Sequence, residues 1–290
     1  MSTKPFGLPN KGNSCFVNSI LQCLYALSYS LSSEQSFPSL ETELPLDRAL
    51  RWRKKFFGNA YSQEDAHEFL LYTLDKLHSR NKKKVMLKFA SSSVPSAHLA
   101  WKQYAEREYS FVIGYFHGQY AVSHTCCSCR HVSTSYEPFM GVELAVPQRH
   151  PTDLTVQHLL KDYSRPETIS GYTCARPKCK NRQGSVIQKR KMNRYPQCLV
   201  VTLKRFVYTS NGRCRKNNTL VGISKRVQFY NRTYTLVGIC NHYGSLEGGH
   251  YTADIRKNGK WYNCDDSAID KYHSSNDIPI QNAYILFYVQ

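Results

Sequence analysis

The sequence lacks any apolar run long enough to cross a membrane and any segment with the composition of a signal peptide. A transmembrane helix needs about 18 or more consecutive apolar residues, and the 290 residues contain no such run. The opening residues, MSTKPFG, lack the apolar core that directs export. We therefore expect no contact with membranes and an intracellular location, in the cytoplasm, the nucleus or both.

Acidic residues are also scarce, because 21 Asp and Glu stand against 39 Lys and Arg, for a formal net charge of +18. Such an excess favours acidic partners. The basic residues are dispersed along the chain, which argues for a solvated surface and against nucleic acid as the main partner. Internal repeats and low-complexity tracts are absent as well, and we expect a monomeric globular protein.

A disulfide framework is not indicated, although the chain has eleven cysteines. They lie at positions 15, 23, 126, 127, 129, 174, 179, 198, 214, 240 and 264. In a long chain without a signal peptide, reduced thiols, metal ligands or a catalytic thiol are more frequent than disulfides. The neighbours of each cysteine must therefore indicate its function.

The pattern of secondary structure places helices first and strands later. Residues 7–24 predict a Gly- and Asn-rich loop that runs into an amphipathic helix. Residues 61–78 predict a second helix that begins with a capping box of Ser62 and Asp65. From Phe111 onward the pattern is mainly that of strands. This order is typical of an α+β fold with segregated layers.

Cys15 lies at the junction of the first loop and its helix, where Asn13 or Ser14 is expected to cap the helix. The unpaired N–H groups and the dipole of a helix start favour an anion. We therefore expect a lowered pKa for Cys15 and a nucleophilic thiolate. Asn10 supplies a side-chain amide donor close by. Taken alone, Cys15 is equally well explained as an ordinary buried cysteine.

The stretch 247–266, EGGHYTADIRKNGKWYNCDD, supplies a candidate base. Asn258-Gly259 predicts a two-residue hairpin loop. The resulting register places Asp265 on the same face as His250 and turns Asp266 to the other face, so Asp265 is expected to orient His250. Together with the thiol of Cys15, His250 and Asp265 supply the residue types of a Cys–His–Asp catalytic triad. Alone, His250 would be explained as a structural histidine.

Two pairs of cysteines have the spacing of metal ligands, Cys126-x2-Cys129 and Cys174-x4-Cys179. Each spacing lets a tight turn present two thiolates to one ion, and the four together complete a tetrahedral zinc shell. Because a closed shell leaves no open position, this zinc would be structural. Two alternatives stay open, namely four reduced buried thiols and a zinc ribbon that binds nucleic acid.

Several boxes of the sequence together resemble the catalytic domain of the ubiquitin-specific proteases. In chain order they are GLPNKGNSCFVNS (7–19), LQCL (21–24), QEDAHEF (63–69), GQ (118–119), EPF (137–139), LKRF (203–206), GHY (249–251), WYNCDD (261–266) and AYILFY (283–288). The resemblance therefore covers nearly the whole chain. The x4 spacing of Cys174 and Cys179 departs from the x2 spacing that is common in this family.

The resemblance implies a papain-like cysteine peptidase of thumb–palm–fingers architecture, as a single catalytic domain over residues 1–290. Residues 1–110 would be mainly the helical thumb, 111–206 mainly the zinc-bearing β fingers, and 207–290 mainly the antiparallel β palm. Cofactor use would be limited to one structural zinc.

The resemblance also implies roles for individual residues. Cys15 would be the nucleophile, His250 the general base and Asp265 the orienting residue. Asn10 would donate a hydrogen bond to the oxyanion.

Further residues are implied to bind the substrate. Gln63 and Asp65 resemble positions that hold the extended C-terminal tail of ubiquitin, where Asp65 can pair with a tail arginine. Gly249 and Tyr251 would bind the same tail, and Gly249 allows a substrate backbone to approach closely.

These features predict a deubiquitinating cysteine protease that hydrolyses the isopeptide or peptide bond after the C-terminal glycine of ubiquitin. Its partners would be ubiquitin and ubiquitinated proteins. The rivals are a catalytically silent ubiquitin-binding module, a protease for a ubiquitin-like modifier, and a general papain-like peptidase.

Overall fold

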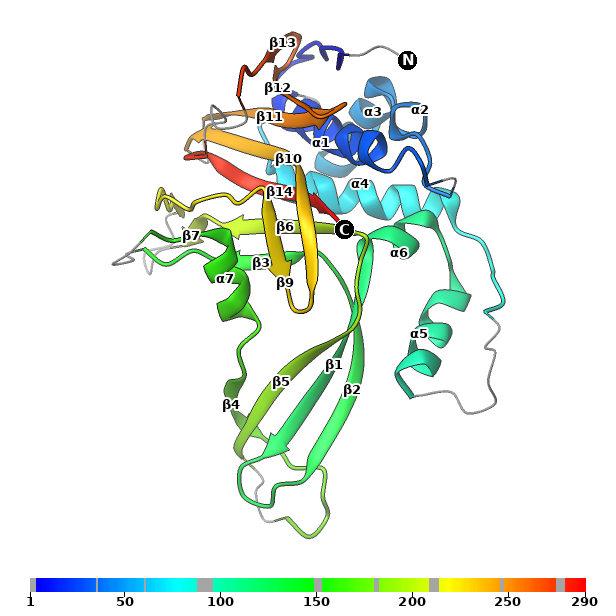
Figure 1. The fold of residues 1–290 in the computed structure, drawn as a ribbon, viewed down its shortest axis with the longest axis vertical. Coiled ribbons are helices and arrows are strands. Elements are labelled where there is room, and N and C mark those ends of the chain that lie inside the picture. The colour runs from blue at the N-terminus through cyan, green and yellow to red at the C-terminus, as the bar shows by residue number, and fades with distance from the viewer. Residues whose placement is uncertain are drawn as a thin grey trace.

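The structure, a computed structural model, describes residues 4–34, 36–59, 61–87, 96–148, 153–179, 183–208, 214–245, 248–274 and 280–290. Its helices are α1 (Cys15–Ser30), α2 (Leu40–Glu43), α3 (Leu46–Phe57), α4 (Ala66–Asn81), α5 (Ser96–Arg107), α6 (Phe111–Phe116) and α7 (Val156–Tyr163) (Figure 1). Within the described ranges, no helix combines the length and the apolar composition that a membrane span requires.

Eight strands form a large sheet in the order β13-β12-β11-β10-β14-β6-β3, with β9 paired to β10. They are β3 (Val142–Ala145), β6 (Cys198–Lys204), β9 (Arg226–Phe229), β10 (Arg232–Gly244), β11 (Gly249–Lys257), β12 (Lys260–Asp265), β13 (Ala268–Lys271) and β14 (Ala283–Val289). Every pairing is antiparallel except that of β3 with β6. The last strand of the chain, β14, therefore lies inside the sheet.

The run AYILFYV of β14 is apolar throughout because both faces of the large sheet are covered. Successive side chains of a strand point to opposite faces. Ile285 and Phe287 join the cluster that includes α1 and α4, whereas Leu286 and Tyr288 join the cluster on the other face, which includes α7. All seven residues of β14 are buried as a result.

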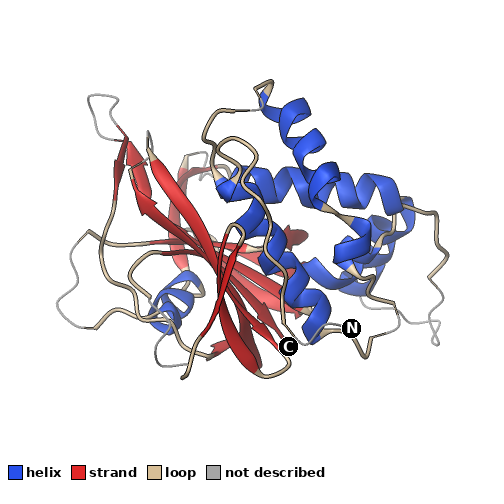
Figure 2. Cartoon of the chain, turned by 90° about the horizontal axis from the view of Figure 1, so that it is seen from above, coloured by secondary structure: helices blue, strands red, loops and turns tan. Residues whose placement is uncertain are grey.

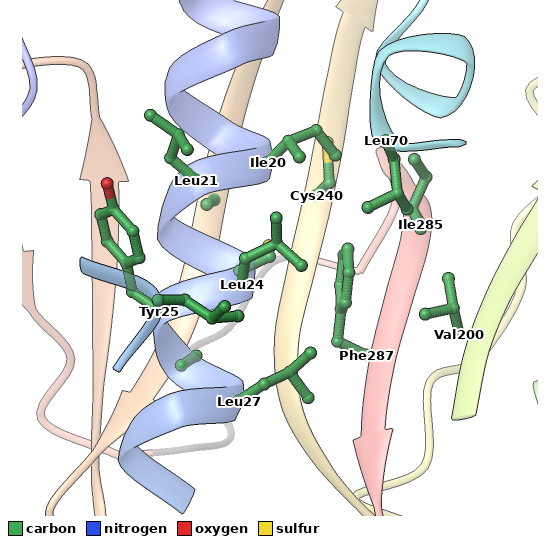
Figure 3. Close-up of a cluster of buried hydrophobic side chains, with 14 of the residues drawn as sticks. Ile20, Leu21, Leu24, Tyr25, Leu27, Leu70, Val200, Cys240, Ile285 and Phe287 are labelled. Atoms are coloured by element: carbon green, nitrogen blue, oxygen red, sulfur yellow. The ribbon is translucent and has the colours of Figure 1, made fainter. Parts of the chain in front are cut away.

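The helix that carries Cys15 is anchored along its length. Ile20, Leu24 and Leu27 of α1 point toward β10 and β14 (Figure 3), and each is fully buried. Burial of one such side chain stabilises the fold by about 1.5–3 kcal/mol. The start of α1 is therefore held firmly against the large sheet.

A small sheet of four antiparallel strands extends away from the large one (Figure 1). Its order is β2-β1-β5-β4, with β1 (His117–Cys126), β2 (Val132–Met140), β4 (Glu167–Tyr172) and β5 (Gly184–Arg194). Five of the six residues of β4 are exposed. A separate short pair joins β7 (Phe206–Tyr208) to β8 (Cys214–Lys216).

The predicted α+β class is confirmed, since most helices lie together on one side of the large sheet (Figure 2). The expectation of strands from Phe111 onward was incomplete. Helix α6 begins there with Ser110 as its cap, and α7 begins after Thr155, whose Oγ1 accepts from the N–H of His158 at 3.2 Å. Short capped helices of six and eight residues give too few turns for a periodic pattern to be visible.

Residues 111–206 supply all four strands of the small sheet, and they also supply β3 and β6 of the large sheet. The segment therefore contributes to both sheets, and the chain crosses from one sheet to the other more than once.

The second predicted helix begins at a different cap from the one expected. Asp65 is the N-cap of α4, because its Oδ1 accepts from the N–H groups of His67 and Glu68. The hydroxyl of Ser62 instead donates to Glu64. The apolar residues Ala66, Phe69, Leu70, Leu74 and Leu77 of this helix are buried.

Candidate active site

The first loop and the start of α1 place Cys15 at the boundary between helices and sheet. Its thiol is buried, with 2% of the residue exposed. Ser14 occupies the N-cap position as predicted but makes no capping bond. Its hydroxyl accepts from the N–H of Lys11 at 2.8 Å, which closes the loop on itself instead.

The prediction of a lowered pKa for Cys15 was wrong. Burial raises the pKa of this thiol above its ordinary value, and the nearby charge of Asp266 raises it further. Main-chain N–H groups of Tyr251, Phe16 and Cys15 itself favour the thiolate, but burial outweighs them. The surroundings of Cys15 in the free protein therefore favour the thiol over the thiolate.

The hairpin predicted from Asn258-Gly259 is present, with both loop residues at positive φ, 51° and 76°. Strand β11 pairs with β12 from Lys257–Lys260 to Ala253–Cys264, in the predicted register. A two-residue loop with left-handed backbone at both positions matches the twist of the two strands. The strand pairing that positions His250 therefore follows from the local sequence.

His250 and Asp265 lie in direct contact. His250 Nε2 and Asp265 Oδ1 are 2.6 Å apart, and both side chains are about half-exposed. Because Nε2 is taken by the carboxylate, Nδ1 remains for a second partner. The expected contact of His250 with Asp265 rather than Asp266 is thus present, while its catalytic role stays a prediction.

Asp266 has a different function, which the sequence did not reveal. Its backbone is left-handed, with φ at 50°, so its side chain turns toward α1. Asn10 Nδ2 donates to one oxygen at 2.8 Å and Asn18 Nδ2 donates to the other at 2.7 Å. The main-chain oxygen of Asp266 also accepts from the N–H of Leu8 at 2.8 Å. Asp266 therefore ties the first loop and α1 to the hairpin.

Asn10 is oriented from both ends of its amide. Its Oδ1 accepts from the N–H of Ser14 at 3.0 Å, and its Nδ2 donates to Asp266. An amide nitrogen carries two hydrogens, so one remains for another acceptor. Asn10 is exposed, and that second hydrogen is open to a ligand.

The predicted substrate-binding residues are engaged with one another or with the core. The Gln63 carboxamide forms two hydrogen bonds with the main chain of Gly249. Asp65 Oδ2 accepts from the hydroxyl of Tyr284 at 2.7 Å, in addition to capping α4. The side chain of Tyr251 is buried, and its main-chain N–H faces the thiol.

The four predicted metal ligands come together where β1 ends and where β4 leads into β5. The Sγ atoms of Cys126 and Cys179 are 3.9 Å apart, and those of Cys129 and Cys174 are 3.7 Å apart. All four lie within 4.8 Å of one another. Thiolates in a tetrahedral zinc site are about 3.8 Å apart, given a Zn–S distance of about 2.3 Å. This four-cysteine cluster therefore fits such an ion.

The sequence matches the profile of the ubiquitin carboxyl-terminal hydrolase family over residues 6–288. It is 31% identical to ubiquitin carboxyl-terminal hydrolase 2 of Bos taurus and of Homo sapiens, over 97% of this chain and 54% of each relative. The chain thus spans about half the length of these relatives. The protein of the same name from Gallus gallus is also 31% identical, with 92% of its length covered.

Solved structures agree with the fold. Two of them are the SAGA Ubp8/Sgf11/Sus1/Sgf73 module bound to ubiquitin aldehyde and a form of the same module bound to monoubiquitin. In each, the match covers 98% of this chain and 69% of the matched chain. Both comparisons give a TM-score of 0.74 at 23% identity. The chain belongs to the ubiquitin carboxyl-terminal hydrolase family and has its α+β, papain-like fold.

Proposed function

We propose that this member of the ubiquitin carboxyl-terminal hydrolase family hydrolyses the isopeptide or peptide bond after the C-terminal glycine of ubiquitin, with Cys15 as nucleophile. The observation that carries the proposal is the 2.6 Å contact between His250 Nε2 and Asp265 Oδ1 on the strand that also borders Cys15. A histidine oriented in this way has its second nitrogen free to act as a base.

The first step is general-base attack rather than attack by a preformed thiolate, because burial raises the pKa of Cys15. His250 Nδ1 takes the thiol proton while Sγ bonds to the carbonyl carbon of the terminal glycine. Asp265 stabilises the imidazolium and keeps its tautomer. Among the described residues no hydrogen bond joins Cys15 to His250, so the two side chains must approach each other when substrate binds.

The developing oxyanion needs donors at the start of α1. The second hydrogen of Asn10 Nδ2 and the N–H of Cys15, which begins the helix, are the candidates. His250 then gives its proton to the departing lysine amine, and the carbon–nitrogen bond breaks. Water, deprotonated by His250, hydrolyses the thioester and releases ubiquitin with a free carboxylate.

The four-cysteine cluster would hold one zinc ion through Cys126, Cys129, Cys174 and Cys179. When bound, the zinc supplies a closed tetrahedral cross-link and no catalytic position. It would join the turn after β1 to the segment between β4 and β5, and so shape the end of the small sheet. That sheet would contact the globular body of ubiquitin.

A fluorogenic ubiquitin substrate and a ubiquitin probe with a C-terminal electrophile test the proposal. We expect turnover by the reduced, zinc-loaded protein and modification of Cys15, identified by peptide mass spectrometry. Binding of ubiquitin without turnover would indicate a silent binding module. Cleavage of short peptides or of ubiquitin-like fusions, with ubiquitin untouched, would replace the substrate in the proposal.

A further inference from the structure

The side chain of Gln63 makes two hydrogen bonds across the site. Gln63 Nε2 donates to the main-chain oxygen of Gly249 at 2.7 Å, and the N–H of Gly249 donates to Gln63 Oε1 at 2.8 Å. Gln63 is exposed and lies in the loop before α4, whereas Gly249 begins β11, 186 positions later. One carboxamide thus joins the helical side of the site to the sheet.

The backbone of β11 determines which edge Gly249 presents. His242 of β10 pairs with Tyr251, yet its N–H donates to Asn282 and its oxygen accepts from Lys216 Nζ. His242 therefore exchanges no backbone hydrogen bonds with Tyr251, and the backbone groups of Tyr251 point to the opposite edge of β11. Because orientation repeats every two residues, those of Gly249 point to that same edge.

This β11 edge, residues 249–252, has no partner strand in the part of the chain that the structure describes, because β12 pairs only with residues 253–257. At two positions of this β11 edge, Tyr251 and Gly249, the backbone faces the helical side of the site. The N–H of Tyr251 faces the thiol of Cys15, and Gly249 faces Gln63. Gln63 therefore occupies the place that a residue of a neighbouring strand would take beside Gly249. Gly249 lies two residues along β11 from Tyr251, which faces Cys15.

We propose that Gln63 is a latch, a side-chain substitute for the peptide group of the substrate tail, which closes the β11 edge in the free protein. This inference rests on the proposed function, since the entering chain is the C-terminal tail of ubiquitin. A peptide group offers the same N–H and C=O as a carboxamide. A tail that adds to the edge as an extended strand takes over both bonds of Gly249 and releases Gln63.

Gly249 is closely packed on the sheet side of the latch, so we expect the latch to open by movement of Gln63. A Cβ on Gly249 would lie 2.3 Å from His242 Nε2 and 2.7 Å from the main-chain oxygen of Tyr243. This position of β11 therefore has no room for a side chain. With the contact between Gln63 and Gly249 formed, Cys15 is buried and His250 is about half-exposed.

The alternative is that Gln63 is a structural staple, and the molecule contains a staple of identical chemistry. Gln157 on α7 donates to the main-chain oxygen of Gln228 at 2.9 Å and accepts from its N–H at 2.7 Å. Gln228 belongs to β9, and Cys15 is not part of the cluster that α7 and β9 share. Gln157→Ala is thus a control that removes the same two bonds elsewhere.

The first measurement is hydrogen exchange at the Gly249 amide in the free protein, by NMR with glycine-selective labelling. Gln63→Ala should accelerate this exchange by at least about 10-fold, while Gln157→Ala should not change it. Gln63→Glu keeps an acceptor for the Gly249 N–H but has no donor for its carbonyl, so an intermediate rate is expected. Equal exchange in all four proteins would overturn the latch.

The second measurement is labelling of Cys15 by a glycyl-glycine peptide with a C-terminal electrophile, relative to labelling by iodoacetamide. Opening the latch should raise the relative labelling rate about 5-fold in Gln63→Ala, since a larger fraction of the protein is open. Gln157→Ala should label like the unaltered protein. Faster Gly249 exchange without faster peptide labelling would make Gln63 a staple like Gln157.

Neither measurement uses ubiquitin, so the latch and the proposed function can fail separately. If the full ubiquitin substrate is not turned over, the proposed function fails while Gly249 exchange still reports the latch. If ubiquitin is turned over and Gln63→Ala leaves exchange unchanged, the latch alone is wrong.

Discussion

The large sheet and the small sheet gain their stability in different ways. All seven residues of β14, inside the large sheet, are buried, whereas none of the nine residues of β2 in the small sheet is. Apolar clusters cover both faces of the large sheet. The small sheet contributes Tyr120, Val122 and Met192 to one of these clusters. Its other end carries the four-cysteine cluster.

This difference shows that one chain can stabilise two of its regions by different means. Stabilisation by burial grows with the apolar area removed from water, and the small sheet buries little. A structural zinc contributes on the order of 10 kcal/mol in small domains, so the proposed zinc would compensate for the small apolar core of this sheet. Cys15 lies on α1 against the large sheet, and His250 and Asp265 belong to its strands β11 and β12. Changes there should affect turnover, while changes at the four-cysteine cluster should affect the small sheet.

The largest expected effect separates turnover from stability within the large-sheet region. Cys15→Ala removes the proposed nucleophile, and turnover of a fluorogenic ubiquitin substrate should fall by at least about 1,000-fold. Ubiquitin binding and zinc content should persist. The control is Cys23→Ala, which removes another buried thiol of α1. Residual turnover by Cys15→Ala close to that of the control would contradict the assignment.

The next effect concerns the partner of His250. Asp265→Ala should lower kcat by roughly 100-fold, because general-base catalysis loses the group that orients the imidazole. Asp265→Asn keeps an oxygen for Nε2–H and should lose less. Asp270→Ala, on the neighbouring strand and exposed, is the matched control. Steady-state kinetics would exclude the role if Asp265→Ala and Asp270→Ala behaved alike.

The third effect is confined to the small sheet. Cys126→Ser should release about one zinc per chain and increase hydrogen exchange in β1, β2, β4 and β5, while β10 and β14 stay protected. The adjacent exposed thiol provides the control, as Cys127→Ser should retain the metal. Mass-resolved exchange and metal analysis measure both. Uniform loss of protection in the two sheets would show that their stabilities are coupled.

The smallest effect is on pH dependence, and it distinguishes the sheets by their buried histidines. Burial lowers the pKa of His242 to about 4, with Lys216 as a lesser cause, and burial also lowers that of His117 to about 4. The unfolded chain, with an ordinary pKa of 6.5, then binds more protons between pH 4 and pH 6.5. Stability is therefore highest above this window and falls as the pH drops through it, by up to about 3 kcal/mol for each histidine.

Urea unfolding at several pH values measures this slope. His242→Gln should reduce the dependence of the unfolding free energy on pH. His158 is exposed, and His158→Gln should leave that dependence unchanged. An identical slope in His242→Gln would show that this histidine is not buried in its neutral form.

Local sequence was sufficient wherever local geometry decides the structure. The Asn258-Gly259 loop determines the register of its own hairpin, and that register brought Asp265 rather than Asp266 to His250. Likewise, the close spacing within each cysteine pair indicated a metal site, and the pairing of β1, β4 and β5 brings the two pairs together. The sequence boxes that resemble the family predicted the papain-like fold, because they cover the chain from residue 7 to residue 288.

The sequence failed where distant segments meet. The pKa of Cys15 is set by burial under the sheet and by Asp266, about 250 residues away, rather than by the local helix start. Ser14 and Ser62 found other partners than the capping bonds expected. The bond between Gln63 and Gly249 spans 186 positions, and no periodic pattern indicates such a pairing.

The tie between Asp266 and the first loop has a consequence for the order of events during synthesis. Asn10, Leu8 and Asn18 emerge from the ribosome early, but the group that joins them to the hairpin is made about 250 residues later. Central strand β14 follows later still. Until then the nascent chain carries Cys15 without the proposed base and without the contact that orients Asn10. The proposed catalytic site is therefore assembled only after the β11–β12 hairpin and Asp266 have been synthesised.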